Sequence, residues 1–143
     1  MNRIELIVQR GQEVDVDVVR ILVDDSDLID LARRVERPFA NAEGHPDIAG
    51  GYDGLMPSEW LALPERYSTD DRVAVLACAC GEIGCWPLRV RVVIEDDRVT
   101  WTDFQQPYRE SWDLSTLGPF VFDRAQYDRE VMRIQALARQ ADA

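Results

Sequence analysis

The strongest constraint on the fold is the alternation of apolar and polar residues within residues 88–104. Every second residue of 88–94 is apolar, and a second β-type segment covers residues 99–104. Successive side chains of a strand point to opposite faces, so a period of two predicts half-buried strands. Asp96 and Asp97, between the two segments, fit a two-residue hairpin turn. The pattern therefore predicts a pair of antiparallel strands.

Three more strands are predicted in the first 80 residues. Residues 4–8 alternate before a turn at Gly11, and residues 14–23 form the returning strand of a hairpin. The apolar parity changes at Val18–Val19, which predicts a β-bulge or a strand end that is covered on both faces. Residues 72–80 are apolar at nearly every position, so we expect this strand in the centre of the sheet.

Two segments have the 3.6-residue period of amphipathic helices. The first begins where Ser26 or Asp27 caps it, and it ends at Pro38. The second begins at Asp123, with Gln126 in the place of a capping-box partner. Its apolar stripe consists of Tyr127, Val131, Ile134, Ala138 and Ala141.

These elements predict an α+β fold. We expect a two-layer sandwich with a mainly antiparallel sheet of about five strands and two principal helices on one face. Residues 39–59 and 105–117 are expected to be irregular, because glycine, proline and polar residues interrupt any period there. A chain of 143 residues has the usual length of one domain, so residues 1–143 are predicted to form a single domain.

The chain carries a formal charge of −11. A surface of this sign repels nucleic-acid phosphates and anionic membranes, so neither is an expected partner. The longest apolar run, residues 73–80, is too short to cross a bilayer, and residues 1–8 lack the apolar run of a signal peptide. We therefore expect a cytoplasmic protein, and the charge suits a protein partner with a basic surface.

All three cysteines lie close together in the sequence, at Cys78, Cys80 and Cys85. Residues i and i+2 of a strand share a face, so the first two thiols point the same way. Gly81 and Gly84 allow the chain to reverse tightly and to bring the third thiol back beside them. The spacing therefore predicts three sulfur atoms in one small volume.

Three thiolates supply most of the four ligands that a zinc site requires. His45 is the expected fourth ligand, and Glu82 or Asp47 is the alternative. With that many protein ligands, zinc would stabilise the fold and leave little room for a substrate. Other interpretations stay open: buried apolar side chains, redox-active thiols, or a Cys80–Cys85 disulfide, which a reducing cytosol disfavours.

No catalytic residue is assigned, because the G-x-S-x-G, phosphate-loop and dinucleotide motifs are absent from the sequence. His45 and Asp47 lie in a glycine-rich segment, where they form either a general-base pair or an ordinary surface turn. Four aromatic residues in the irregular segments either line a pocket or partner surface or anchor loops onto the sheet. They are Tyr52, Trp60, Tyr108 and Trp112.

Three motifs mark the second half of the chain. They are C-x-C-G-E-x-G-C-W-P-L at 78–88, D-F-x-Q-P at 103–107 and G-P-F-x-F-D-R-x-Q-Y at 118–127. In these motifs the chain resembles a group of small uncharacterised proteins from actinobacteria. The resemblance implies a bacterial cytosolic protein. It implies no activity and no functional residues.

The sequence thus predicts a non-enzymatic, acidic binding protein of the bacterial cytosol, immunity- or regulator-like, with a protein partner. The first alternative is a zinc-binding domain that uses Cys78, Cys80 and Cys85. The second is a small-molecule enzyme or ligand-binding protein that uses the loop around His45. Composition and spacing carry no prediction of the oligomeric state.

Overall fold

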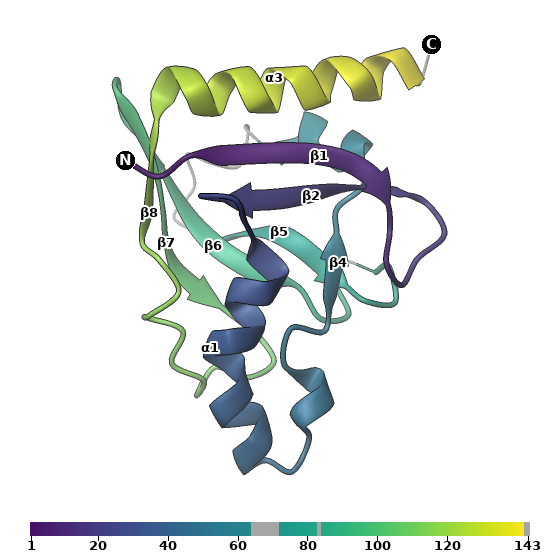
Figure 1. The fold of residues 1–143 in the computed structure, drawn as a ribbon, viewed down its shortest axis with the longest axis vertical. Helices are drawn as coiled ribbons and strands as arrows, with labels where there is room; N and C mark the ends of the chain where they lie inside the picture. Colours follow the sequence, from purple (N-terminus) through teal and green to yellow (C-terminus); the bar gives the residue numbers. More distant parts are fainter. Residues whose placement is uncertain (64–71, 83, 142–143) are drawn as a thin grey trace.

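Two antiparallel sheets form the framework of the chain (Figure 1). This computed structural model describes residues 1–63, 72–82 and 84–141. One sheet has the order β1-β2-β3. Its strands are Ile4–Arg10, Asp17–Val23 and Ser26–Asp27. The other has the order β4-β5-β6-β7-β8. Its strands are Tyr52–Gly54, Val73–Cys78, Leu88–Ile94, Arg98–Gln105 and Phe120–Asp123.

Two isolated β-bridges link the three-stranded sheet to the two edges of the five-stranded sheet. Val19 of β2 pairs with Leu55, which directly follows β4, and its N–H donates to the Leu55 carbonyl at 2.7 Å. At the other end Asn2 pairs in parallel with Phe122 of β8, and its N–H donates to the Val121 carbonyl at 2.7 Å. The strands therefore follow one another in a circuit around the core, which explains the strong curl of the five-stranded sheet.

Helix α3 (Arg124–Ala141) covers the outer edge of β1 with hydrogen-bonding side chains. The Gln126 amide accepts from the Ile4 N–H at 3.1 Å and donates to the Ile4 carbonyl at 2.5 Å. Two residues along the strand, the Leu6 N–H donates to Glu130 at 2.9 Å, and Arg133 donates to the Leu6 carbonyl. The prediction of a capping box was wrong on this point. Asp123 does accept from the N–H of Gln126, but the Gln126 side chain bonds to the Ile4 N–H and carbonyl of β1.

Helix α1 (Leu28–Ala42) begins as predicted and ends later. Asp27 caps it by accepting from the Ile29 N–H at 2.8 Å. Pro38 lies inside the helix, so the prediction that it ends the helix was wrong. Its missing N–H costs one hydrogen bond, but the next turn continues because Ala40 is fully buried and Phe39 stacks on Trp112.

Other boundaries also differ from the prediction. The β1–β2 ladder ends at the pair Arg10–Asp17, so residues 14–16 belong to the connecting loop and not to β2. Residues 39–59 are not wholly irregular. They include the end of α1, the 3₁₀ turns η1 (Pro46–Ile48) and η2 (Pro57–Leu61), and strand β4. The turn η2 begins at Pro57, a residue favoured at the first position of a helical turn.

The predicted α+β class, mainly antiparallel with a five-stranded sheet, is confirmed. The arrangement differs in two respects, because the first hairpin forms a sheet of its own and the two helices contact different strands. Helix α1 packs on β2 and β3, whereas α3 packs on β1, β7 and β8. Among the described residues, the curled sheets and both helices share one hydrophobic core cluster. No helix within those residues has the length and apolar character to cross a bilayer.

Candidate metal site

The cysteines lie in a tight turn that begins at the end of β5. The Gly81 N–H donates to the Cys78 carbonyl at 2.8 Å, and the Cys78 N–H donates to the Glu82 carbonyl at 3.2 Å. The Cys85 N–H also donates to the Glu82 carbonyl, at 3.4 Å. Gly81 has φ of +94°, a conformation that other residues rarely adopt, so glycine is needed where the chain reverses.

This turn brings all three sulfur atoms together. The Sγ atoms of Cys78, Cys80 and Cys85 lie within 4.8 Å of one another. Zinc–sulfur bonds of about 2.3 Å place two tetrahedral thiolates about 3.8 Å apart, so the sulfurs need to close by about 1 Å or less. Cys80 and Cys85 are exposed, Cys78 is half-buried, and all three are free thiols. The predicted gathering is confirmed, and the three cysteines are able to hold a metal ion.

The pKa values of Cys80 and Cys85 are shifted in opposite directions by hydrogen bonds within the turn. The backbone N–H of Glu82 and the neighbouring thiols of Cys78 and Cys85 lower the pKa of Cys80. Hydrogen bonds with Cys80 and Cys78, and the charges of those groups, raise the pKa of Cys85 to about 11. Of these two thiols, Cys80 therefore loses its proton more easily than Cys85. A bound cation would favour deprotonation of the others.

Contacts from two other segments, at Gly51 and at Tyr108–Arg109, hold the turn in place. The Ala79 N–H donates to the Gly51 carbonyl at 3.0 Å, and the Tyr108 hydroxyl donates to the Gly84 carbonyl at 2.6 Å. The ring of Trp86 stacks on Tyr108 with centroids 6.2 Å apart. The guanidinium of Arg109 lies 5.2 Å from the centre of the Trp86 ring. The turn that carries the sulfur atoms is therefore anchored to the segments at Gly51 and Tyr108.

The other predicted ligands are not part of this group. Among the described residues, the group of mutually close ligating atoms contains three cysteines and no histidine or carboxylate. His45 is exposed at the start of η1. Asp47 lines a cavity of about 370 Å³ that Ala79 also borders, yet its carboxylate lies outside the group. Glu82 is exposed in the turn and contributes backbone atoms to it.

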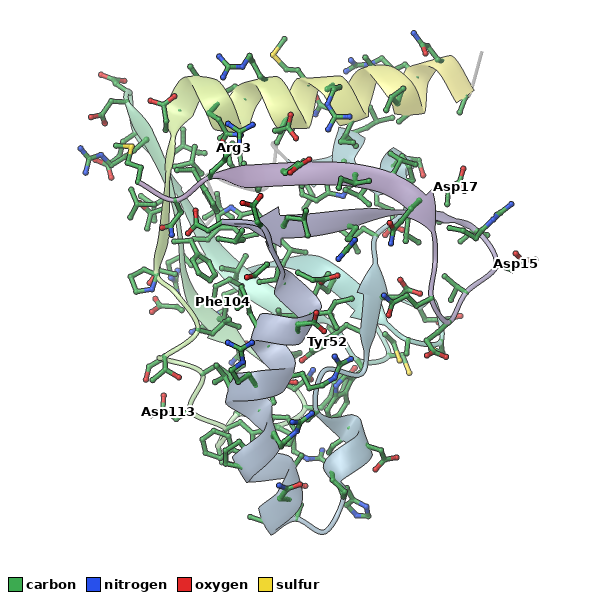
Figure 2. All side chains as sticks on the ribbon, in the orientation of Figure 1. Arg3, Asp15, Asp17, Tyr52, Phe104 and Asp113 are labelled. Atoms are coloured by element: carbon green, nitrogen blue, oxygen red, sulfur yellow. The ribbon has the colours of Figure 1, made fainter. Side chains whose placement is uncertain are left out.

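The predicted aromatic set is mostly buried. Tyr52, Trp60 and Trp112 belong to the hydrophobic core, and only Tyr108 of the four is exposed. The carbonyl of Trp60 accepts from Gln135 of α3. Figure 2 shows Tyr52 pointing from β4 toward α1. The buried side-chain amide of Gln106 bonds to both Tyr52 and Tyr108. Trp60 instead lies on η2, which packs against α3.

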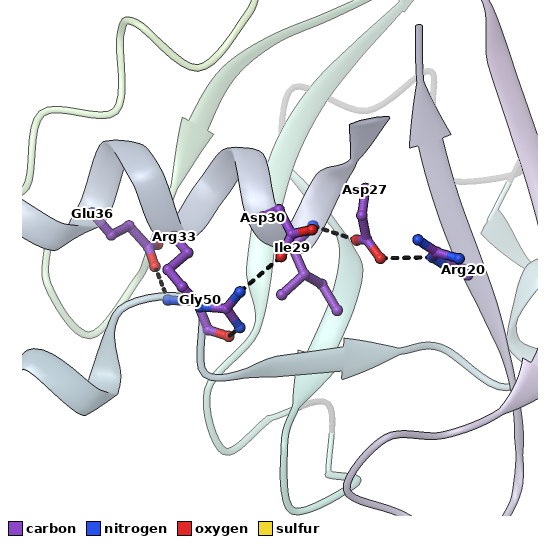
Figure 3. A network of polar contacts seen from close by, with 7 residues as sticks. All are labelled: Arg20, Asp27, Ile29, Asp30, Arg33, Glu36 and Gly50. Atoms are coloured by element: carbon purple, nitrogen blue, oxygen red, sulfur yellow. Dashed lines mark hydrogen bonds and ion pairs between the residues drawn. The ribbon is translucent and has the colours of Figure 1, made fainter. Parts of the chain in front are cut away.

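A buried carboxylate that the sequence interpretation missed lies behind the turn. Glu36 of α1 is 0% exposed. It accepts from the Gly50 N–H at 2.8 Å, as Figure 3 shows, and from the Tyr52 hydroxyl at 2.5 Å. The Gln106 amide donates to the Tyr52 oxygen at 3.1 Å and to the Pro87 carbonyl at 3.0 Å. Burial raises the pKa of Glu36 despite these donors.

The helical period contains the signal that would have found this residue. Positions 28, 32 and 36 share one face of α1, and the first two are Leu28 and Ala32, both fully buried. A glutamate that continues an apolar stripe has to find donors inside the protein. Gln106 is a second buried polar residue with internal partners, because its amide bonds to Tyr52, the Pro87 carbonyl and the Tyr108 N–H.

Comparisons of the chain with protein-family models, with curated proteins and with solved structures found no match. The resemblance to small actinobacterial proteins stays a prediction.

Proposed function

We propose that this chain is a metal-binding protein that holds zinc through Cys78, Cys80 and Cys85. The observation that carries the proposal is the mutual approach of three sulfur atoms within 4.8 Å. Thiolates are soft ligands, so a three-sulfur site favours zinc or copper(I) over magnesium or calcium, which prefer oxygen. Zinc suits the geometry because its thiolate bonds tolerate a compact tetrahedral arrangement.

Exposure and the free thiols argue against two of the other interpretations, buried apolar side chains and a disulfide. Buried cysteines serve as small apolar side chains, but Cys80 and Cys85 are exposed, and none of the three belongs to the core. A disulfide would remove two of the three sulfurs, and all three are free. The hydrogen bonds of the turn present the sulfurs together without a covalent link.

Metal content and thiol titration of one sample test the proposal. The full chain is purified under reducing conditions, loaded with zinc and freed of excess by gel filtration. We expect about one equivalent of zinc and thiols that react slowly until a chelator is added. Cys80→Ser should lose most of the metal, and Ser111→Ala, an exposed change elsewhere, should keep it. Less than about a tenth of an equivalent in the wild-type chain would contradict the proposal.

A second candidate function is that of an acidic module for a protein partner. The observation that favours it is the loop between β1 and β2, in which Glu13, Asp15 and Val16 are exposed (Figure 2 labels Asp15). An apolar residue between acidic ones suits a basic surface with an apolar centre. Binding of this kind weakens as salt rises. A search at low salt that recovers no partner, from an extract in which the chain is expressed, would count against it.

A further inference from the structure

Three cysteines supply three of the four ligands of a tetrahedral zinc ion, so the proposed site needs one more donor. We infer that the bound ion is an exchangeable centre on the surface, and that its fourth position takes a neutral nitrogen donor of the imidazole type from outside the chain. This inference rests on the proposed function. It departs from the expectation that zinc supports the fold, and four features of the structure lead to it.

The first feature is that the core does not depend on the cysteines. The core cluster draws residues from both sheets and both helices, and it includes Ile4, Val90, Trp101 and Ile134 but none of the three thiols. The turn is shaped by hydrogen bonds of the chain itself, including those of Gly51 and Tyr108. Small zinc domains that unfold without metal lack such a core. We therefore expect this fold to persist when a chelator removes the ion.

The second feature is the direction in which the site faces. Cys78 ends a strand of the five-stranded sheet and is half-buried, whereas Cys80 and Cys85 are exposed. An ion bound to all three has the sheet on the side of Cys78. Its remaining tetrahedral position therefore points toward solvent, where small molecules and partner side chains have access.

The third feature is the ligand set. Within the described residues, no histidine, aspartate or glutamate joins the three sulfur atoms. Three protein ligands and one open position are the arrangement of zinc sites that exchange a ligand, whereas structural sites are closed by four. Glu82 is the nearest carboxylate in the sequence, and a variant at this position tests whether its side chain closes the site.

The fourth feature is charge, which decides the class of donor. A divalent ion with three thiolates has a net charge of about −1, and the chain carries a further −11 in formal charge. A fourth anionic donor would add to this repulsion, and a neutral imidazole nitrogen does not. The structure therefore favours a nitrogen heterocycle over a carboxylate or an external thiolate.

Cobalt(II) makes the fourth ligand visible, because its absorption spectrum reports the donor set. The full chain is loaded with one equivalent of cobalt(II) and titrated with imidazole, and cobalt(II) in buffer alone is the reference. We expect the visible bands to shift and to saturate at one imidazole per ion while the sulfur-to-cobalt absorption persists. Acetate at the same ionic strength should leave the bands unchanged. The Glu82→Gln chain should give the same titration.

The outcomes separate the inference from the proposed function. If cobalt(II) shows no sulfur-to-metal absorption in the wild-type chain, the proposed metal site is wrong and the inference falls with it. If that absorption is present but imidazole leaves the bands unchanged, the open position is wrong and the metal site stands. The open position is likewise wrong, and the metal site stands, if Glu82→Gln alters the cobalt spectrum before imidazole is added. Displacement of imidazole by acetate would lead to the same conclusion.

Circular dichroism of the chelated chain tests the exchangeable character. We expect an unchanged far-ultraviolet spectrum and a cooperative thermal transition after removal of the ion. Added zinc should still raise the transition temperature, because any ligand that binds only the folded state does so by mass action. Loss of the folded spectrum on chelation would make the ion structural and would overturn this part of the inference.

Discussion

The hydroxyl of Tyr52 lies 2.5 Å from a carboxylate oxygen of Glu36, and both residues are buried. This contact joins α1 to β4, whose Tyr52 pairs with Cys78 in the sheet. The same carboxylate accepts from the Gly50 N–H, one residue before the Gly51 carbonyl that receives the Ala79 N–H. The backbone of the cysteine turn is thus positioned by a polar network in the interior.

Removal of the Tyr52 hydroxyl should destabilise the fold. Tyr52→Phe takes one of two donors from the Glu36 carboxylate and one acceptor from the Gln106 amide, and all three groups are buried. Unsatisfied buried groups cost about 1–3 kcal/mol each, so we expect a loss of roughly that size in urea denaturation. Tyr108→Phe is the matched control, because its ring is exposed and its loss should stay below about 1 kcal/mol. Equal effects of the two changes would contradict the role of the network.

The stability contribution of Glu36 should fall as pH rises. Burial raises its folded pKa above the ordinary value of 4.5, although Tyr52, Gly50 and Arg33 oppose the shift. The folded state therefore binds the proton more tightly than the unfolded chain does. Its contribution is complete below about pH 4.5 and is lost as pH rises through the folded pKa.

Glu36→Gln isolates this effect, because a neutral amide cannot titrate. The difference in unfolding free energy, wild type minus variant, should decrease between about pH 4.5 and neutrality. Groups such as Glu59, whose pKa is also raised, titrate equally in both chains and cancel. A difference that stays constant over this range would show that Glu36 has the same pKa in both states.

Alkylation should modify Cys80 before Cys85. Cys80 and Cys85 are both exposed, but the pKa of Cys80 is lowered and that of Cys85 is raised to about 11. The thiolate is the reactive form, so iodoacetamide near pH 7.5 should label Cys80 first. Peptide mass spectrometry with limiting reagent measures the order. Zinc should protect the labelled site, and magnesium at the same concentration is the control. Faster labelling of Cys85 would reverse the assignment.

Pro38→Ala should stabilise the chain. Pro38 is exposed within α1 and cannot donate the N–H that would close its turn of the helix. Alanine restores this donor and removes the ring from the preceding turn, so we expect a gain of about 1–3 kcal/mol by urea denaturation. Arg37→Ala, an exposed neighbour, should change stability by less than about 0.5 kcal/mol. A destabilised Pro38→Ala chain would mean that the proline is favoured by the last turn of α1.

Local patterns predicted the elements whose stability depends on neighbours in sequence. The hairpin of β6 and β7 follows from alternation and from the Asp96–Asp97 turn, and the Glu95 N–H does bond across it to the Arg98 carbonyl. The sulfur cluster was predictable for the same reason, because strand geometry and Gly81 act within a few residues.

Contacts between distant segments decided the features that were missed. Pro38 stays in a helix because Ala40 is buried against the core. Gln126 leaves its expected cap because Ile4, far away in sequence, offers it a free peptide group. Glu36 is buried because Gly50 and Tyr52 supply donors from another element. None of these partners can be found from the spacing of residues alone.

The coverage of β1 by α3 has a consequence for behaviour in a crowded cell. An uncovered strand edge is a template on which a second molecule can add a strand and start a fibril. Here the amide of Gln126 and the carboxylate of Glu130 already occupy the outward peptide groups of Ile4 and Leu6. The last helix thus shields this strand edge from a second molecule, and its detachment would leave the edge free to pair.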